Sequence, residues 1–287
     1  MGVFYETIPE TLIDWIRAQN VFWVATAPLS GSGHVNVSPK GGKYFGVLDE
    51  RTFWACLSIM KYLDLSGSGN ETISHLIEPG NGRITIQMNE FKRAAPKIVR
   101  LWGHGLVLPR ESKDFNHFVE SQDLHDMLRE LPGHRSVIIV DIHQVGSSCG
   151  FSVPYMDHAG FRTTLNDVYA KKDKKFREGN KDESMERYWS YKNSWSIDKL
   201  PGLPNVVAYG KRNKIEPITK MVGPRAPQTH PYTKLDSNIM IFMMIVWSFL
   251  AGVLITLHFE TLLGLITDFV PPAMIDLLTQ AIPQTKA

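Results

Sequence analysis

The chain has 287 residues, a formal net charge of +2 at pH 7 and 43% hydrophobic residues. This apolar content is enough for a buried core, which excludes a disordered chain, and the near-neutral charge argues against a dedicated nucleic-acid-binding protein. The two cysteines, Cys56 and Cys149, give neither a disulfide framework nor a zinc spacing, which favours a reducing compartment. Because Glu6, Glu10 and Asp14 interrupt the first residues, no signal peptide is expected.

The first half of the chain predicts one helix followed by short strands. Thr7, Pro9 and Glu10 form a capping-box pattern that predicts a helix over about residues 9–19. Runs rich in β-branched and aromatic residues then predict strands at 21–29, 34–40, 44–48, 52–57, 83–88, 98–108 and 136–145. A polar helix is predicted over 113–131. Because strands do not alternate with helices, this order favours an antiparallel barrel with helices at its mouth over a parallel Rossmann sheet.

The stretch from Leu65 to Leu76 predicts a turn between a strand and a helix. Such a turn gathers free backbone N–H groups, where an anionic group binds well. Gly67 and Gly69 permit positive φ and a close approach to a ligand, and the stretch is rich in neutral hydrogen-bond donors. These donors are Ser66, Ser68, Asn70, Thr72 and Ser74. The alternative is a helix that follows a flexible turn and is capped by Asn70 or Ser68.

The C-terminal part changes character. Residues 162–199 are charged and mostly helical, and 201–234 are rich in Pro, Gly, Lys and Arg, which is typical of a linker. The run from Ile239 to Leu257 is uncharged and would reach roughly 28 Å as a helix, about one hydrocarbon thickness. The positive-inside rule then predicts a single-pass C-terminal membrane anchor with the main domain cytoplasmic. The alternatives are a buried helix of a cytoplasmic protein or a segment lying at the membrane interface.

Motifs of common enzyme classes are missing from the sequence. It contains no Gly-x-Ser-x-Gly, Walker A or His-Glu-x-x-His pattern. His75, His104 and His143 do not have the short helical spacing of a metal site, so no metal is expected. Thr72 replaces the last glycine of a dinucleotide fingerprint that would begin at Gly67, which makes such a site a weak hypothesis.

Several sequence blocks together resemble the pyridoxamine 5′-phosphate oxidase-like family, in particular its fungal and bacterial branch. The blocks are Phe22-Trp-Val-Ala-Thr-Ala-Pro28, His34-Val-Asn-Val-Ser-Pro-Lys40, Gly67-Ser-Gly-Asn-Glu-Thr-Ile-Ser-His-Leu76, Gly82-Arg-Ile-Thr-Ile86, Ile98-Val-Arg-Leu-Trp-Gly103 and Val145-Gly-Ser-Ser-Cys-Gly-Phe-Ser-Val-Pro154. The set is specific, although each block alone is not. The resemblance extends from about Val3 to Gly202.

The resemblance implies a mainly β fold with flanking helices, the FMN-binding split antiparallel β-barrel, usually a homodimer with FMN at the subunit interface. To this the sequence adds a C-terminal hydrophobic helix. The predicted domains are a split barrel over 1–202, a linker over 203–237 and a membrane segment with its tail over 238–287.

Matched position by position, the resemblance also implies a cofactor site. Asn36, Ser38 and Lys40, on the outward face of their strand, match the strand that lies along the flavin and its ribityl chain. Arg100 is expected to add positive charge near the cofactor. The turn that holds the FMN phosphate matches Ser66, Gly67, Ser68, Gly69, Asn70 and Thr72. The alternatives are a solvated lysine at a hairpin end for Lys40 and a surface or ion-paired arginine for Arg100.

Three departures from the family pattern leave the function open. Asn70 and Glu71 stand where the classical oxidase has a basic pair, and Glu71 is expected to point away from the phosphate. Residues 55–61 look like an insertion or a gene-model error, and the C-terminal substrate motif has no match. One hypothesis is an FMN-dependent oxidoreductase with an unknown small-molecule electron donor and acceptor and unknown catalytic residues. The alternative is a non-catalytic barrel that binds flavin or another ligand as a carrier, sensor or scaffold.

Overall fold

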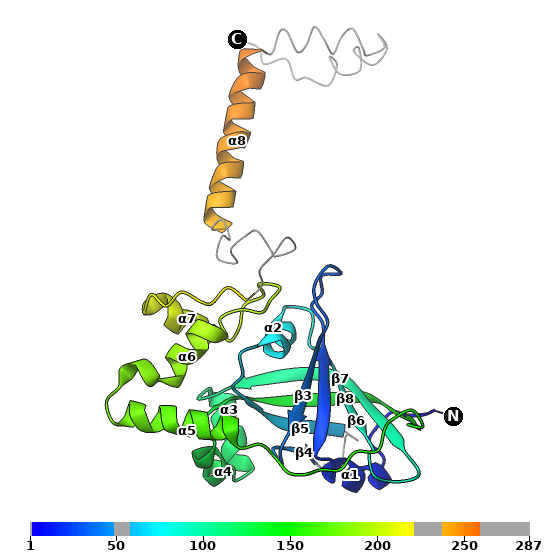
Figure 1. The fold of residues 1–287 in the computed structure, drawn as a ribbon. Helices are drawn as coiled ribbons and strands as arrows, with labels where there is room; N and C mark the ends of the chain where they lie inside the picture. The colour runs from blue at the N-terminus through cyan, green and yellow to red at the C-terminus, as the bar shows by residue number, and fades with distance from the viewer. Residues whose placement is uncertain (1, 49–57, 221–236, 259–287) are drawn as a thin grey trace, which may run out of the picture. The chain divides into compact units, whose positions relative to one another are not determined.

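The computed structural model describes residues 2–48, 58–220 and 237–258 of a chain that divides into two compact units, Met1–Gln228 and Thr229–Ala287 (Figure 1). The larger unit holds the sheet and most helices. The smaller unit contains α8 (Ser237–Leu257).

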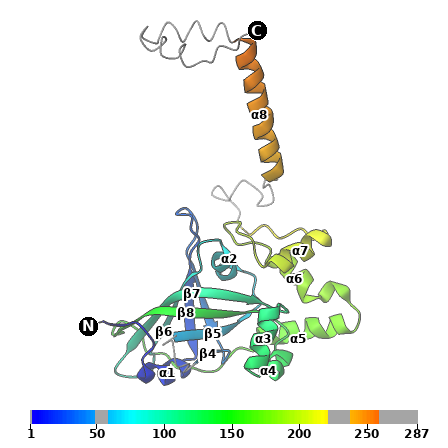
Figure 2. The same cartoon turned by 180° about the vertical axis from the view of Figure 1, so that it is seen from behind.

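Within the described residues, eight strands form one antiparallel sheet in the order β3-β2-β6-β7-β8-β5-β4, and β1 pairs with β8. The sheet curls into a half-barrel with helices around it, as Figures 1 and 2 show from opposite sides. This confirms the mainly β, antiparallel fold. The strands are β1 (Val3–Tyr5), β2 (Val21–Thr26), β3 (Asn36–Gly41), β4 (Phe45–Leu48), β5 (Ser58–Leu65), β6 (Arg83–Asn89), β7 (Lys97–Pro109) and β8 (His134–Cys149).

The apolar core fills the concave side of the sheet. Alternate residues of β2 and β6 point inward, as the period of two requires. Phe22 and Val24 on β2 and Ile84, Ile86 and Met88 on β6 are almost completely buried. Helix α1 (Glu10–Arg17) contributes a buried apolar face to the same core. The predicted capping box is wrong, because Pro9 is the N-cap residue and no side chain caps the helix.

The edge strand β3 reverses the usual inside–outside pattern. Its polar residues Asn36, Ser38 and Lys40 are half-buried, whereas Val37 is 59% exposed. The prediction that the polar residues form the outward face is therefore wrong. They turn inward because they find partners there: Asn36 donates to Thr72 Oγ1 (3.1 Å), and the Lys40 ammonium reaches the Asp64 carboxylate (3.0 Å).

Two helices replace the single helix predicted over 113–131. They are α3 (Lys113–Ser121) and α4 (His125–Glu130), and the chain changes direction between them at Asp123, whose φ is +49°. An aspartate tolerates this left-handed conformation better than most residues do. Further along lie α5 (Thr164–Arg177), a short 3₁₀ helix (Lys181–Glu183) and α6 (Met185–Lys192).

The predicted linker begins with a helix instead. α7 (Pro204–Arg212) has Pro204 at its first position and packs on α6, where the Ser190 hydroxyl donates to the Val206 carbonyl (2.9 Å). Val206 is 3% exposed. The larger unit therefore extends past residue 202. The Pro and Gly content of this stretch led to the prediction of a linker. Proline is nevertheless compatible with the first turn of a helix, which is where Pro204 lies.

The predicted strand over 52–57 lies outside the described residues, as do residues 55–57 of the suspected insertion. Ser58 to Lys61, the rest of that segment, belong to β5. This strand pairs with β8 on one side and β4 on the other. These four residues are thus part of the sheet.

In the smaller unit, α8 covers the run from Ile239 to Leu257. Among the described residues, no helix is both long enough and apolar enough to span a membrane. The predicted membrane anchor therefore has no support from the structure.

Candidate functional site

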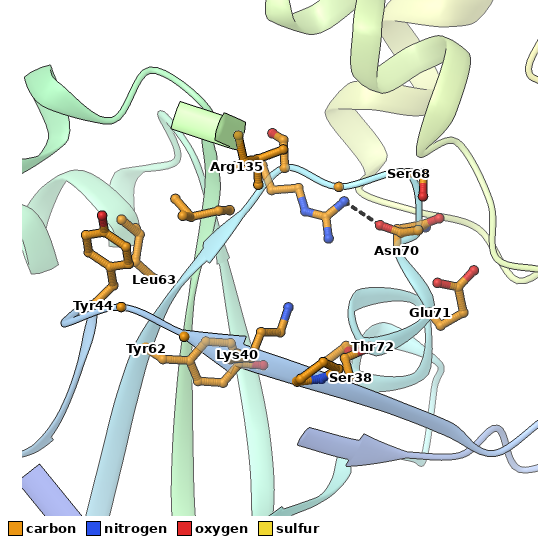
Figure 3. Close-up of a pocket in the computed structure, with 18 of the residues that line it drawn as sticks. Ser38, Lys40, Tyr44, Tyr62, Leu63, Ser68, Asn70, Glu71, Thr72 and Arg135 are labelled. Carbon is orange, nitrogen blue, oxygen red and sulfur yellow. Dashed lines mark hydrogen bonds between the residues drawn. The ribbon is translucent and has the colours of Figure 1, made fainter. Parts of the chain in front are cut away.

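A cavity of about 400 Å³ lies between strand β3 and the β5–α2 turn (Figure 3). Helix α2 spans Glu71–Ile77. The described lining residues are Phe22, Ser38, Pro39, Lys40, Gly41, Gly42, Tyr44, Tyr62, Leu63, Leu65, Ser66, Gly67, Ser68, Gly69, Asn70, Glu71, Thr72, Arg135 and Leu165. β3 and β4 are the two ends of the strand order, so the cavity occupies the region where the sheet does not close.

Three charged side chains bridge the two walls of this cavity. Asp64 on β5 is fully buried and accepts hydrogen bonds from Lys40 on β3 (3.0 Å) and from Arg135 on β8 (2.5 Å). Burial by itself would raise the pKa of Asp64, but the charges and hydrogen bonds of Arg135 and Lys40 outweigh it and hold that pKa below its usual value. The carboxylate is therefore ionised, and the cluster carries one net positive charge at the cavity wall.

The turn from Ser66 to Asn70 is fixed by side chains from distant parts of the chain. The Trp189 indole donates to the Ser66 hydroxyl, which donates to the Gly133 carbonyl, both at 2.6 Å. The two glycine carbonyls of the turn are held as well. Arg135 donates to Gly69 O (2.8 Å), and Asn193 donates to Gly67 O (3.1 Å).

With their carbonyls bound in this way, the peptide N–H groups of the turn stay available. Among the described hydrogen bonds, none is donated by the backbone N–H of Gly67, Ser68 or Gly69. Neither glycine has positive φ, so that part of the prediction is wrong. A Cβ at Gly69 would lie 2.3 Å from a Glu71 carboxylate oxygen, a contact that a shift of the flexible Glu71 side chain would relieve.

The alternative of a side-chain-capped helix is not what the structure contains. Asn70 is the N-cap residue of α2, but its side chain accepts no hydrogen bond from the first turn. Its amide instead donates to the Ser74 hydroxyl (2.7 Å), while its oxygen accepts from Lys220 (2.8 Å). The N–H groups of the first turn are left without a side-chain cap.

Tyr62 contributes a buried hydroxyl to the cavity wall. The side chain is 1% exposed, and its oxygen has no hydrogen-bond partner among the described residues. Burial, followed by the nearby Asp64 carboxylate, raises the pKa of Tyr62 well above its usual value, so the phenol stays protonated. A buried hydroxyl without a partner is costly, which makes it a position where a ligand atom could complete the hydrogen bonding.

Glu71 is one of the lining residues, and its direction relative to a bound phosphate stays a prediction. Its carboxylate is 3.6 Å from the Lys220 ammonium, and the two side chains are 17% and 11% exposed. The sequence gives no sign of this partner, because Lys220 is 149 positions away and lies in the predicted linker.

Most predicted site residues meet in one place. Ser38, Lys40, Ser66, Gly67, Ser68, Gly69, Asn70 and Thr72 all line the cavity. Asn36 lies behind it, bonded to Thr72 and to Ser38. Arg100 on β7 does not line it, and its guanidinium is 3.5 Å from the Ser148 hydroxyl.

The sequence analysis missed Tyr62, Asp64 and Arg135. A usable signal existed, because Asp64 and Arg135 interrupt apolar strands, and charged residues are almost never fully buried unless they are paired.

None of the three histidines considered as a metal set lines the cavity. His75 is buried and pairs with the Thr26 hydroxyl (2.9 Å), while the His104 and His143 rings lie 5.3 Å apart on β7 and β8. In the described part of the chain, no group of three or more His, Cys, Asp or Glu side chains is placed to hold a metal ion.

Comparison with known proteins shows a relative of part of this chain. No family model matches it. A pyridoxamine 5′-phosphate oxidase family protein, ustO of Aspergillus flavus, is 42% identical over 159 residues, which are 55% of this chain and 58% of that protein. The chain therefore spans less than two thirds of that relative's length.

Solved structures give weaker matches. HupZ of Group A Streptococcus is 16% identical, with 53% of this chain and 100% of that chain covered at a TM-score of 0.36. An FAD-binding protein of Mesorhizobium loti is 15% identical, with 52% and 99% covered at a TM-score of 0.35. No argument rests on likenesses of this degree. The match to the Aspergillus protein confirms the resemblance predicted from the sequence blocks: part of this chain is similar to a pyridoxamine 5′-phosphate oxidase family protein.

Proposed function

We propose that this protein binds FMN in the cavity between β3 and the β5–α2 turn and acts as a flavin-dependent oxidoreductase on an unidentified small molecule. The observation that carries the proposal is the juxtaposition of the uncapped turn at 66–70 with the buried Lys40–Asp64–Arg135 cluster in one cavity. The named relative adds independent support through its family.

The residues present fit a phosphorylated, planar ligand. The cavity volume of about 400 Å³ falls within the range of roughly 300–1,000 Å³ that is typical of small-molecule sites. Free N–H groups at the turn suit a phosphate, and the net positive charge of the cluster favours it further. Phe22, Tyr44 and Tyr62 supply an aromatic wall, and the Tyr62 hydroxyl supplies an unused donor.

Each wall of the cavity has a separate role in this proposal. The turn at 66–72 would hold the phosphate, and Ser38 and Lys40 on β3 would lie along the rest of the cofactor. A bound flavin supplies hydride or electron transfer, whereas the protein supplies binding, orientation and charge. The Lys40 ammonium, held by Asp64, would favour an anionic reduced cofactor close to it.

A second copy of the chain is part of the proposal, as the resemblance implies. Exposed apolar side chains include Phe4 on β1 (67% exposed), Val37 on β3 (59%) and Val35 just before β3 (72%). Apolar residues that gather on an edge strand and its neighbours are costly to leave in water. A homodimer that covers them is the expected assembly, and its mass in solution tests it.

The alternative function, a non-catalytic carrier or sensor, has one observation in its favour. The ionisable groups of the described lining are either engaged or unsuited to proton transfer at neutral pH. Lys40 and Arg135 are bound to Asp64, Glu71 is paired with Lys220, and the pKa of Tyr62 is raised. In this alternative the cavity would hold a flavin without turning over a substrate.

An absorbance spectrum of the full chain, before and after addition of FMN and gel filtration, tests the proposal. Retained flavin bands near ~370 and ~450 nm are the expected result. A protein that neither carries nor takes up flavin contradicts the proposal. If flavin is retained, anaerobic mixing with NAD(P)H, followed by oxygen, tests one common electron donor: bleaching and recovery of the flavin bands would support the oxidoreductase over the carrier.

A further inference from the structure

Lys220 lies in the segment that follows α7, and its side chain contacts two residues of the cavity wall. Its ammonium donates to Asn70 Oδ1 (2.8 Å) and lies 3.6 Å from Glu71 Oε1. The side chain is 11% exposed. A lysine held this deep in the protein needs an anionic or polar partner, and both of its partners line the cavity at the turn.

The contact between Lys220 and Glu71 matters because the Glu71 carboxylate lies beside the turn. Its carboxylate lies so close to the turn that a Cβ on Gly69 would be 2.3 Å from Oε2. A carboxylate at this position repels a phosphate brought to the N–H groups of Gly67, Ser68 and Gly69. In a partly buried site this repulsion is screened much less than it would be at the surface.

The charges around the cavity show what Lys220 changes. Lys40, Arg135 and Lys220 stand against Asp64 and Glu71, which leaves one net positive charge. Without Lys220 the described charges of the site would cancel. The two carboxylate oxygens of Asp64 already accept hydrogen bonds from the other two cations, Lys40 and Arg135. Lys220 is therefore the cation that offsets Glu71.

The position of Lys220 is set by the helices before it. The Ile215 N–H donates to the Gly210 carbonyl and the Ile218 N–H to the Tyr191 carbonyl, both at 2.9 Å. These bonds anchor the strand-like segment between α7 and Lys220 to the ends of α6 and α7. These backbone hydrogen bonds thus hold Lys220 next to the turn.

We propose that Lys220 is a positioning residue that neutralises and holds Glu71 so that the turn at 66–70 accepts a phosphorylated ligand. The inference rests on the proposed function and deepens it, because it makes Lys220 a determinant of the preference for FMN over riboflavin. The two flavins share a ring system and differ in the phosphate, so the pair isolates the charge effect.

The test compares binding of FMN and of riboflavin to the full chain by quenching of flavin fluorescence. Lys220→Met is expected to weaken FMN binding about tenfold and riboflavin binding less than twofold, since one partly buried charge is removed near the phosphate alone. Lys220→Arg restores FMN binding. Adding Glu71→Gln to Lys220→Met restores it as well, because the uncompensated carboxylate is then gone. Lys214→Met, an exposed lysine in the same segment, is the matched control and leaves both affinities unchanged.

Each other outcome overturns one of the two proposals. Unchanged FMN binding in Lys220→Met overturns the role of Lys220, and so does an equal loss for both flavins, which would mark a purely structural contact. A wild-type chain that binds neither flavin contradicts the proposed function instead. In that case the increase in Tm caused by inorganic phosphate decides the role of Lys220. If Lys220→Met no longer shows this increase in Tm, the inference about Lys220 is supported. If the increase persists in Lys220→Met, the inference is overturned.

Discussion

The two halves of the curled sheet are built on different principles. Around β2, β6 and β7 the interior is apolar, and Val24, Ile86 and Leu101 are completely buried. Around β3 and β5 the interior also holds the charged side chains Lys40, Asp64 and Arg135, beside buried apolar residues such as Met60. A buried charge cluster of this kind is a poor source of stability compared with apolar packing. The closed half thus contributes the apolar packing of the fold, and a ligand site in the open half, as proposed above, would account for the buried charges there.

Asp64→Asn tests the open half with the largest expected effect. The substitution leaves Lys40 and Arg135 without their shared carboxylate, and breaking a buried ion pair in this way costs about 3–5 kcal/mol of unfolding free energy. Urea unfolding measures it. Added FMN or phosphate should recover part of the loss, since an anion can replace the missing charge. A cost below about 1 kcal/mol would mean that the cluster is not coupled to the fold.

Ile86→Ala is the counterpart in the closed half. Ile86 is fully buried, so the substitution leaves a cavity and costs about 2–5 kcal/mol. Unlike the loss in Asp64→Asn, this loss of unfolding free energy should be the same with and without ligand. If FMN rescued both variants equally, the distinction between the two halves would fail.

Lowering the pH should weaken the protein in two steps. Burial, helped by the charge of Arg110, lowers the pKa of His134 to about 4, below the ~6.5 of an unfolded histidine. The unfolded chain therefore binds the extra proton first, and stability falls as the pH drops from about 6.5 to about 4.

Asp64 acts at lower pH. Its pKa is held below the unfolded value of ~3.9, so the stability from its pairs is present above that value and is lost only at more acidic pH. Urea midpoints at pH 7, 5.5 and 4.5 would resolve the first step, which His134→Gln should flatten. A flat wild-type profile over this range would contradict the assignment.

Trp189→Phe should have a smaller effect, confined to the turn. It removes the indole N–H that bonds the Ser66 hydroxyl, at a cost of about 1 kcal/mol for one buried hydrogen bond. If flavin binds as proposed, the loosened turn should also lower FMN affinity several-fold more than riboflavin affinity. Titration of both flavins checks this, and an effect on riboflavin alone would be the opposite of what the geometry requires.

Arg100→Met should have the smallest effect. Arg100 lies on β7 with its guanidinium 3.5 Å from Ser148, and it does not line the cavity. We expect FMN affinity within a factor of about two of the wild type. A tenfold loss would instead place Arg100 at the cofactor, and the site would then need a second copy of the chain to complete it.

Much of the architecture could be predicted because it depends on local pattern. The alternation of β2 and β6 and the turn chemistry at 66–70 were visible in the sequence, and they predicted the strands and the turn that lines the cavity. What could not be predicted depends on contacts between distant residues. Nothing near Asp64 indicates Arg135, and nothing near Glu71 indicates Lys220. The inward turn of β3 likewise follows from partners on β5 and α2.

The side chains that fix the turn at 66–70 are synthesised long after the turn itself. Ser66 and Gly67 are bonded to Trp189 and Asn193, which follow them by 123 and 126 positions. During synthesis the sheet residues of β5 emerge long before these braces do. A nascent chain that ends before α6 thus has these strands but not the side chains that fix the turn. If the turn binds a phosphorylated ligand as proposed, capture of that ligand is expected only after α6 has left the ribosome.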